Sequence, residues 1–373
     1  MLLLAMRKFF IVISYFLLIA CTKESDDKAS MTSISLENIK EVRHTKLTLA
    51  EAKGLETTSE NLMGLKLRIR FSNQKIFIMD EEAKQKSIQV FHQSGKYLGA
   101  AIEEGEGPDQ VPSIIDFHVS EDDELFVLSG AGDKVAIYQI DENPIQKFEV
   151  NYIATSFTKL PNGKYLLYGG YNSPFVQNRI IKLSNKGNLE GTYLPNDYSG
   201  KLLPMSERNF YKQGNELFII ESFSDHILTY EHDSLHQVMK IDFGAYAIPK
   251  WFWKSDIMES FPKLNEKGFG NIIGVYRGHN LTLAECMIQG TNGVEKELLL
   301  IDHKGSPVKV SITDAKTPWL FHPVGIDDKD NLLFITYRSI LEQYLKEAGG
   351  SETFSLPKKA FDYPILISMT LTS

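Results

Sequence analysis

Histidine and aspartate residues stand close together at two places in the chain, and metal binding is the chemistry they would most directly support. His232, Asp233 and His236 form the first group, and Asp302 and His303 form the second. A His pair at i, i+4 converges on one face of a helix, but the flanking residues predict turns between strands. We therefore expect no metal and no cofactor at either place.

The sequence patterns of common catalytic sites are also missing. The chain has no Ser-His-Asp order with a nucleophile elbow, no P-loop, no dinucleotide-binding fingerprint and no paired-cysteine metal motif. This favours a binding protein over an enzyme, without excluding catalysis.

Aromatic and basic side chains in loops and at strand ends are the candidates for ligand binding. Trp251 and Trp253 stand in an insertion, where exposed rings could stack on sugars or cap a peptide, or could instead bury the insertion. The other candidates lie at the ends of predicted strands: Tyr276, Arg277, His279, Tyr337 and Arg338.

The first 20 residues read as a signal peptide rather than as part of the fold. A basic start is followed by an apolar run from Phe9 to Ile19, which is too short to span a bilayer. The run ends in Leu18-Ile19-Ala20-Cys21, which resembles the lipobox of bacterial lipoproteins, and an ordinary secretory signal is the alternative. We therefore expect a signal peptide over 1–20, lipidation of Cys21 and a flexible tether over 21–32.

This reading predicts an outer-membrane lipoprotein of the cell envelope. The acidic cluster in the tether resembles a signal for display at the cell surface, and a solvated linker is the alternative, so the periplasmic face and the surface both stay open. Asp233-Ser234-Leu235 fits the short pattern on which Bacteroidota attach O-glycans to exported proteins. Ser234 is thus a candidate glycosylation site, although so short a motif also arises by chance.

Composition narrows the class of partner. With 373 residues and a hydrophobic fraction of 43%, the chain can bury a large core in one or two domains. The net charge of -8 and the dispersed Lys and Arg residues exclude a polyanion-binding face, so no nucleic acid partner is expected. Cys286 is the only cysteine besides Cys21, and no disulfide is predicted.

The stretch 75–150 contains a unit that the rest of the chain repeats. It predicts short strands joined by Gly-containing turns, with nearly continuous apolar inner strands and an alternating outer strand. Six such units predict an all-β, six-bladed β-propeller of four-stranded antiparallel blades over 33–373, with a β-sandwich as the alternative. Strands within 34–49 are expected to close the ring. A helical insertion is expected at about 247–267, with its helix broken at Pro262.

These units resemble the six-bladed propeller lipoproteins of Bacteroidota, which are related to NHL-like and TolB-like propellers. The main mark is Gly105-Glu106-Gly107-Pro108, similar to a G-x-G-P joint between blades, with Asp109-Gln110 in place of the usual Glu and aromatic residue. Further marks are Ile34-Ser35-Leu36, Ile248-Pro249 and Asp362-Tyr363-Pro364-Ile365-Leu366. The resemblance implies a fold and an envelope location but leaves the activity open. The joint glycines are expected to supply positive φ or a close approach.

We expect a non-enzymatic, monomeric binding platform for a glycan, peptide or protein partner, with the ligand at one end of the ring. One alternative is a hydrolase or lyase with its site in the central channel, where Asp116, His118 and Asp327 are the polar inner-strand residues. Another is a scaffold subunit of an outer-membrane uptake complex.

Overall fold

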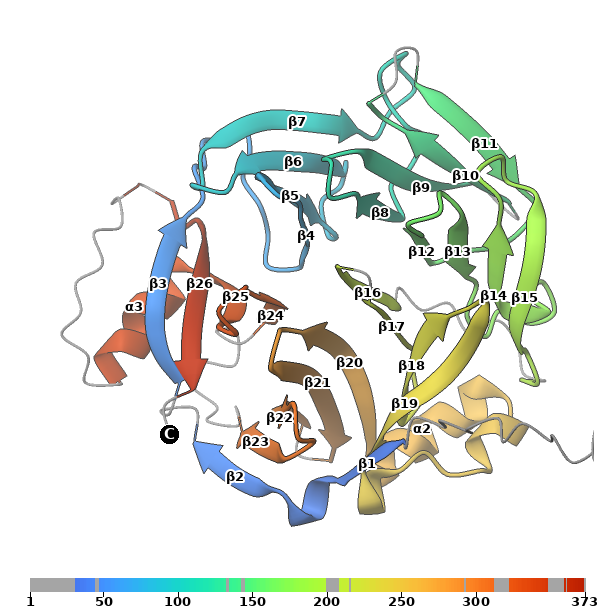
Figure 1. The fold of residues 1–373 in the computed structure, drawn as a ribbon, viewed down its shortest axis with the longest axis vertical. Coiled ribbons are helices and arrows are strands. Elements are labelled where there is room, and N and C mark those ends of the chain that lie inside the picture. The colour runs from blue at the N-terminus through green and yellow to red at the C-terminus, as the bar shows by residue number, and fades with distance from the viewer. Residues whose placement is uncertain are drawn as a thin grey trace, which may run out of the picture.

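Six β-sheets are arranged in chain order around a central axis (Figure 1). The computed structural model describes residues 31–43, 47–131, 134–141, 145–198, 208–214, 216–291, 293–311, 322–347, 359 and 361–371. Residues 1–20 and Cys21 lie outside these ranges. The sheets face one another around the axis instead of stacking as two layers, which confirms the six-bladed propeller and excludes the sandwich.

Each blade is a meander whose strands follow one another from the axis outwards. Blade 1 consists of β4 (Leu67–Phe71), β5 (Lys75–Asp80), β6 (Ser87–His92) and β7 (Tyr97–Glu103). Blade 2 consists of β8 (Asp116–Val119), β9 (Leu125–Ala131), β10 (Lys134–Gln139) and β11 (Gln146–Val150). Blade 3 consists of β12 (Ser156–Lys159), β13 (Tyr165–Tyr168), β14 (Asn178–Leu183) and β15 (Leu189–Pro195). Blade 4 consists of β16 (Phe210–Gln213), β17 (Glu216–Ile220), β18 (His226–Glu231) and β19 (Ser234–Asp242). Blade 5 consists of β20 (Phe269–Arg277), β21 (Leu281–Gly290), β22 (Gly293–Asp302) and β23 (Pro307–Ser311). Blade 6 consists of β24 (His322–Ile326), β25 (Leu332–Tyr337) and β26 (Pro364–Leu371), and β3 (Leu47–Gly54) completes it.

Burial decreases from the second strand of a blade to its outermost strand. In blade 1 the four central residues of β5 are all buried, whereas β7 alternates between half-buried and exposed positions along most of its length. A strand covered by sheets on both faces needs apolar side chains on both faces, and an outer strand needs them on one. The core therefore lies between adjacent blades, in clusters such as the one shared by blades 1 and 2.

The N-terminal strands close the ring and also reinforce two other blades. β3 pairs antiparallel with β26 and so completes blade 6, which confirms closure by an N-terminal strand, although most of β3 lies beyond the expected range 34–49. β1 (Thr32–Ser35) adds a parallel strand to β19, and β2 (Lys40–Arg43) adds one to β23. The same segment thus runs along the outer edges of blades 4, 5 and 6 (Figure 1). The sequence analysis did not predict the parallel pairing of β1 with β19 or of β2 with β23.

The insertion between β19 and β20 is helical, as expected, but its helix is not broken. It contains the short helices η3 (Gly244–Tyr246) and η4 (Phe252–Lys254), followed by α2 (Ile257–Lys267). Pro262 lies inside α2, so the expected break there is wrong. Pro262 has no N–H to donate, but Leu264, two residues further on, is fully buried against Phe223 and Phe269, and this packing keeps the second half helical.

The antiparallel order gives the ring two different faces. At one, here called the turn face, the innermost strands end and turn into the second strands. At the other, the insertion face, lie the connections between blades, the helical insertion and α3 (Arg338–Glu347), which joins β25 to β26. None of the helices that the structure describes is long and apolar enough to cross a bilayer.

Close contacts explain the two glycines in the joint between blades 1 and 2. Neither Gly105 nor Gly107 has a positive φ. A Cβ on Gly105 would instead lie 2.0 Å from Gln110 Oε1, and that oxygen accepts the Gly107 N–H at 2.9 Å. The side chain of Gln110 thus fills the joint and requires a glycine opposite.

Candidate functional site

A cavity of about 770 Å³ occupies the axis on the turn face. This volume falls within the range of roughly 300–1,000 Å³ typical of small-ligand sites. Every blade contributes to its wall through the end of its innermost strand. Representative lining residues from blades 1 to 6 are Arg70, His118, Thr158, Lys212, Tyr276 and Ile326.

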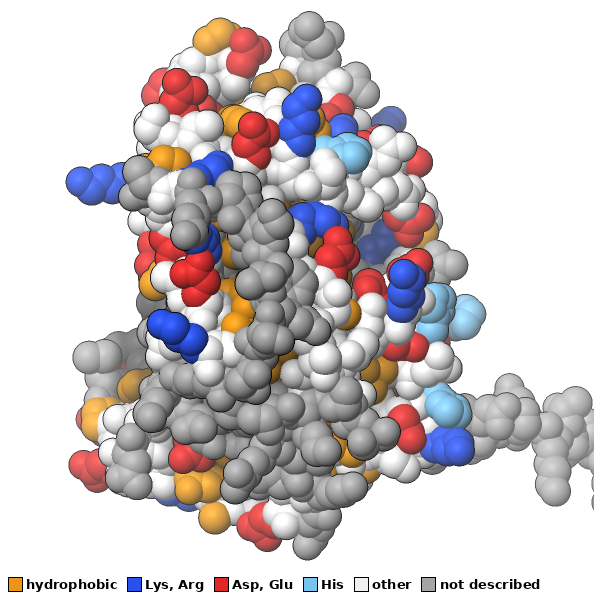
Figure 2. Space-filling view, turned by 90° about the vertical axis from the view of Figure 1, so that its left-hand side faces the viewer, with side chains coloured by type: hydrophobic (Ala, Val, Ile, Leu, Met, Phe, Trp, Pro, Cys, Tyr) orange, Lys and Arg blue, Asp and Glu red, His pale blue; other side chains and the backbone are white. Residues whose placement is uncertain are grey.

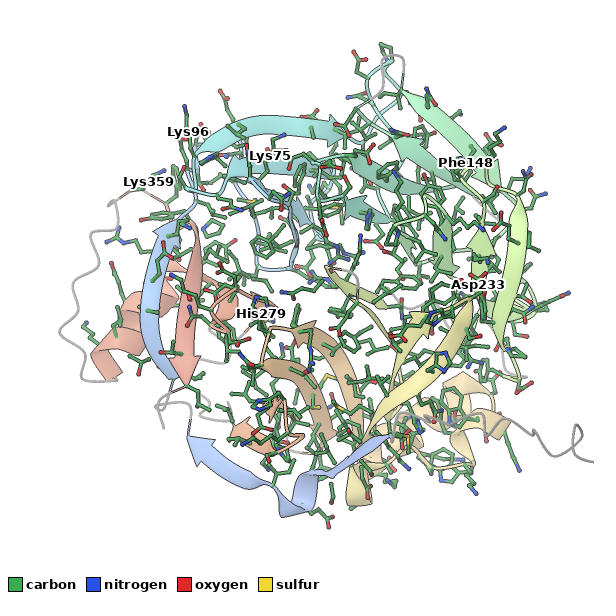
Figure 3. The ribbon with its side chains drawn as sticks, viewed as in Figure 1. Lys75, Lys96, Phe148, Asp233, His279 and Lys359 are labelled. Atoms are coloured by element: carbon green, nitrogen blue, oxygen red, sulfur yellow. The ribbon has the colours of Figure 1, made fainter. Side chains whose placement is uncertain are left out.

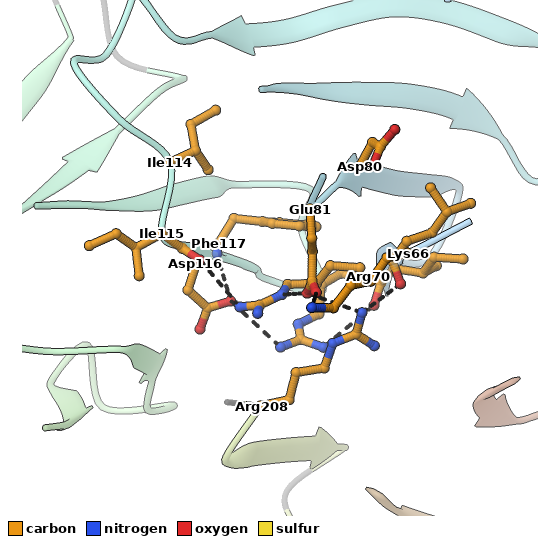
Figure 4. A network of polar contacts seen from close by, with 12 residues as sticks. Lys66, Arg70, Asp80, Glu81, Ile114, Ile115, Asp116, Phe117 and Arg208 are labelled. Atoms are coloured by element: carbon orange, nitrogen blue, oxygen red, sulfur yellow. Dashed lines mark hydrogen bonds and ion pairs between the residues drawn. The ribbon is translucent and has the colours of Figure 1, made fainter. Parts of the chain in front are cut away.

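Below the cavity, towards the insertion face, a buried ionic network joins three blades (Figure 4). Arg68 on β4 donates to Glu81 Oε1 at 2.7 Å and to Asp116 Oδ1 at 2.6 Å, and both Arg68 and Asp116 are almost fully buried. The other Asp116 oxygen accepts the Phe157 N–H of blade 3 at 3.1 Å. Burial disfavours the Arg68 charge, but Asp116 and Glu81 outweigh it and raise its pKa. This network is structural.

Arg208 crosses the axis to reach the same network. It precedes β16 in blade 4, which is opposite blade 1 in the ring, and it donates to the Leu67 carbonyl at 2.5 Å and to Glu81 Oε1 at 3.3 Å (Figure 4). Although burial raises the pKa of Glu81, Arg68 and Arg208 together lower it to about 2. Glu81 is therefore ionised at neutral pH and is shared by two guanidinium groups.

Arg70 lies two residues beyond Arg68 and lines the cavity. Its nearest carboxylate atom is Asp116 Oδ1 at 3.9 Å, which already accepts from Arg68, and its Nη1 donates a long 3.4 Å bond to the Ile69 carbonyl. Burial lowers the pKa of Arg70; Asp116 offsets part of this, and Arg208 and Arg68 lower it further. Arg70 is thus a half-buried cation without a carboxylate of its own.

Lys212 is a second cation on the cavity wall, and His118 is a neutral group beside it. Lys212 is half-buried, and within the described part of the chain no carboxylate forms an ion pair with it. His118 is buried, and its Nδ1 lies 3.3 Å from Thr158 Oγ1. Burial, followed by Lys212 and Arg70, lowers the pKa of His118 to about 3, so this ring is neutral at physiological pH.

The carboxylates on the cavity wall do not balance these cations in its interior. Asp327 is half-buried, but its oxygens accept the N–H groups of Lys329 and Asn331 and the Asn331 amide, which close a turn. The remaining acidic lining residues are exposed at the mouth: Glu51, Glu121 and Asp328. On the outside of the ring, acidic and basic side chains are interspersed on the side shown in Figure 2. The described interior of the cavity therefore carries more positive than negative charge.

Three of the residues predicted from the sequence lie at this cavity or beside it. Tyr276 lines the wall, where its hydroxyl donates to the Pro323 carbonyl of blade 6 at 2.7 Å and so fastens two blades together. Arg277 lines the cavity and lies 3.5 Å from Glu216. His279 is exposed in the following turn, on the same face (Figure 3).

The other four lie on the insertion face. Trp253 packs against Tyr171 and Phe252 at ring distances of 4.9 and 5.1 Å, which fits the interpretation that it buries the insertion. Trp251 is 40% exposed. The Tyr337 hydroxyl donates to the Met63 carbonyl at 3.0 Å, and Arg338 pairs with Glu342 at 2.6 Å. Their role in ligand binding stays a prediction, and it cannot involve the cavity.

The group around His232 forms a turn on the turn face. His232 and Asp233 both have positive φ, and Asp233 binds Lys182 Nζ at 2.9 Å and the Tyr230 hydroxyl at 2.7 Å. Ser234 is exposed at the start of β19. Among the described residues, no group of His, Cys, Asp and Glu is arranged to hold a metal ion. Cys286 is fully buried in β21, and burial raises the pKa of its thiol.

Comparison with protein families gives one match, which covers most of the ring. A family model described as "Domain of unknown function (DUF4934)" matches residues 54–362. The chain belongs to the DUF4934 family. No curated protein matches this DUF4934 chain.

A solved structure similar to most of this DUF4934 propeller supports its fold. An inferred exported protein from Bacteroides fragilis has a TM-score of 0.73 and 16% identity, and the match covers 92% of this chain and 100% of that one. Apo AztD from Citrobacter koseri has a TM-score of 0.43 and 10% identity, with coverage of 88% and 98%. A luciferin-regenerating enzyme has a TM-score of 0.43 and 11% identity, with coverage of 86% and 95%.

Sequence reasoning missed Arg70 and Lys212 of the DUF4934 propeller as site residues. The alternation of Arg68 and Arg70 with Leu67 and Ile69 is typical of a strand with one face in water. In this fold, however, the polar side of β4 faces blade 2, where Arg68 is buried in the ionic network and Arg70 lines the central cavity. The alternation within a first strand was the available signal, but only the ring shows where that side points.

Proposed function

We propose that this DUF4934 propeller is an envelope lipoprotein that binds a carboxylate-bearing ligand in its central cavity. The observation that carries the proposal is the pair of half-buried cations, Arg70 and Lys212, whose potential counterions are already bound elsewhere or absent from the described wall. A charge held in a partly desolvated site without its own partner is costly, and an anionic ligand would offset that cost.

The cavity wall is suited to binding more than to catalysis. Its rings, which include Phe71, Phe157 and Phe210, offer apolar surface beside the cations. A hydrolase or lyase would need a general acid or base free to move a proton. Asp116 is held by Arg68, Asp327 is held by its turn, and His118 stays unprotonated, so the wall mainly supplies hydrogen-bond donors.

Acylation of Cys21 would place this cavity in the cell envelope, as in the Bacteroidota lipoprotein propellers with NHL-like or TolB-like blades that the sequence resembles. The similarity to an exported Bacteroides protein supports the compartment. Within the envelope, the ligand is the acidic group of a glycan or of a peptide, and a partner subunit of an uptake complex could present either.

Calorimetry on the full chain carrying Cys21→Ser would test the binding proposal. Oligosaccharides of hexuronic acid should bind, and neutral oligosaccharides of equal length should not. Arg70→Met and Lys212→Met should each weaken binding about tenfold or more, since a hydrogen bond to a charged group contributes roughly 1.5–3 kcal/mol. Lys186→Met, which removes an exposed turn-face lysine outside the cavity lining, serves as the control.

If carboxylated glycans and peptides ending in a free carboxylate both fail to bind, the proposed function is wrong. Anchoring is tested separately by fractionating cells that express the native chain or Cys21→Ser. The native chain should sediment with membranes and incorporate labelled palmitate, and the variant should do neither. Membrane association that persists in the variant would overturn acylation at Cys21.

A further inference from the structure

A second cavity of about 570 Å³ opens on the turn face between blades 3 and 4. It lies where β12 and β16 end, next to the turn of His232 and Asp233 at the edge of blade 4 (Figure 3). Its lining residues are Lys159, Leu160, Pro161, Asn162, Lys212, Leu217, Tyr230, His232 and Asp233.

Lys212 lines both this cavity and the central one. Residues that line one cavity are also direct neighbours, along the chain, of residues that line the other. On β12, Phe157 and Thr158 line the central cavity and Lys159 lines the second, and on β17 the same change occurs between Phe218 and Leu217. The two cavities therefore lie side by side, with Lys212 at their boundary.

The second cavity offers hydrogen-bond donors around an apolar surface. Leu160, Pro161 and Leu217 supply the apolar part. The one carboxylate, Asp233, is already bound by Lys182 and Tyr230. The Asn162 side-chain oxygen accepts the Lys164 N–H at 3.2 Å, which leaves the amide NH2 as the group it can offer a ligand.

Two lysines and a histidine supply the other nitrogen-bearing side chains of this cavity. Lys159 pairs with Glu124 at 3.1 Å and lies over the Phe126 ring at 4.0 Å, so its charge is partly balanced. Lys212 has no such partner among the described residues, and His232 is exposed at the rim. A ligand that fits this wall is rich in acceptors and carries negative charge.

We propose that the two cavities are consecutive subsites for one linear acidic oligosaccharide. One end enters the central cavity, and the following sugar residues pass Lys212 into the cavity between blades 3 and 4. This inference rests on the proposed function and specifies its ligand as a chain longer than one sugar. Sugar rings present apolar faces, and the ring oxygen, glycosidic oxygen and carboxylate of a hexuronic acid residue only accept hydrogen bonds, so its acceptors outnumber its hydroxyl donors. A peptide backbone carries one N–H donor for each carbonyl oxygen, and these N–H groups would find few acceptors on this wall.

The test measures affinity against chain length for hexuronic acid oligomers, again with the full chain carrying Cys21→Ser. For the wild type, affinity should rise about tenfold or more from the disaccharide to the hexasaccharide and then level off. The double variant Asn162→Ala, His232→Asn should remove most of this gain and leave disaccharide affinity within about twofold. Asn is chosen at 232 because it tolerates the positive φ found there.

Lys212→Met should weaken binding at every length, because Lys212 borders both subsites, and Lys186→Met should change nothing. Unchanged melting temperatures would show that the variants are folded. Equal affinity of the wild type for short and long oligomers would overturn the second subsite while leaving the proposed function intact. Binding of acidic peptides but of no acidic oligosaccharide would overturn the glycan assignment. Failure of both ligand classes would overturn the proposed function itself.

Discussion

Arg68 and Arg70 carry the same charge two residues apart, yet their surroundings give them different roles. Arg68 binds the carboxylates of Glu81 and Asp116 at 2.7 and 2.6 Å. The only carboxylate near Arg70 among the described residues is that of Asp116, which lies further away and is already bound by Arg68. Arg68→Met should lower the free energy of unfolding by about 3–5 kcal/mol, because it leaves Glu81 and Asp116 without their main partner. Arg70→Met should change it by less than about 1 kcal/mol, since it removes a cation disfavoured by burial and by its neighbours.

Urea denaturation at pH 7 of the two variants and the wild type would measure this difference. The comparison is matched in residue type and strand, so the propensity of Met for a β-strand cancels. Similar losses from both variants would show that Arg70 is structural, and would remove the main support for an anion site in the cavity.

The buried His118 and the half-buried His322 predict that the free energy of unfolding falls at mildly acidic pH. Burial, with Lys212 next, lowers the pKa of His118 to about 3, and burial, with Lys296 next, does the same for His322. Below the ordinary value of 6.5, the unfolded chain therefore binds protons that the folded chain does not. Stability should decrease as the pH falls from 6.5 towards 3.

Denaturation midpoints measured between pH 7 and pH 5 follow the net effect, in which the raised pKa of buried Glu285 opposes the two histidines. Glu81, whose pKa is depressed from 4.5 to about 2, loses its contribution only below that interval. His118→Gln should make the profile less steep without abolishing its slope, because His322 keeps its own lowered pKa, and His279→Gln, at an exposed position, should leave the profile unchanged. Identical profiles for the wild type and His118→Gln would contradict the neutral, buried state of His118.

At the scale of elements, the joint between blades 1 and 2 makes a prediction about Gly105. Gly105→Ala would place a methyl group against Gln110 Oε1 and should lower the free energy of unfolding by about 1–3 kcal/mol. Gln110→Ala removes the clashing atom, so the double variant should lose less than the sum of the two single losses. Gly290→Ala is the control, because the nearest atom to its Cβ would be 3.9 Å away. Additive losses in the cycle would show that the two residues do not compete for space.

Most elements could be predicted from the sequence because their signals are local. Apolar runs with Gly-containing turns mark the strands of each blade, and the segment Arg338–Glu347 has a helical pattern. The pairing of β1 with β19 and of β2 with β23 could not be predicted in this way. The partner strands are about 200 or more residues distant in the sequence, and each short strand fits the edges of several blades. Pro262 misled the prediction because tertiary packing of Leu264 outweighs the local cost of proline.

At the scale of the whole molecule, the site escapes sequence analysis for a geometric reason. Arg70 and Lys212 come from blades 1 and 4, and they meet only because six innermost strands end around one axis. The same ring separates residues that seemed equivalent in the sequence. Tyr276 and Tyr337 both end strands, but these strands run in opposite directions, so the two residues lie on opposite faces. The fold was therefore predictable, whereas the site required the position of each strand end.

Closure of the ring by its N-terminal segment leads to the last prediction. A chain that begins after Arg43 loses β1 and β2 but keeps β3, so blade 6 still has its outermost strand. A chain that begins after Gly54 also loses β3 and exposes the edge of β26, whose first six residues are buried in the intact ring. Exposed, apolar strand edges promote association between chains.

The first truncation should therefore remain monomeric with a lowered melting temperature, and the second should aggregate, as measured by light scattering and circular dichroism. Adding a synthetic peptide of residues 44–56 to the second chain should reduce aggregation, because the peptide can pair with β26 in place of β3. If the chain that begins after Gly54 stays monomeric and has the same melting temperature as the chain that begins after Arg43, blade 6 is stable with three strands. Closure by β3 would then be dispensable for this propeller, and the N-terminal segment would act mainly through the parallel strands it adds to blades 4 and 5.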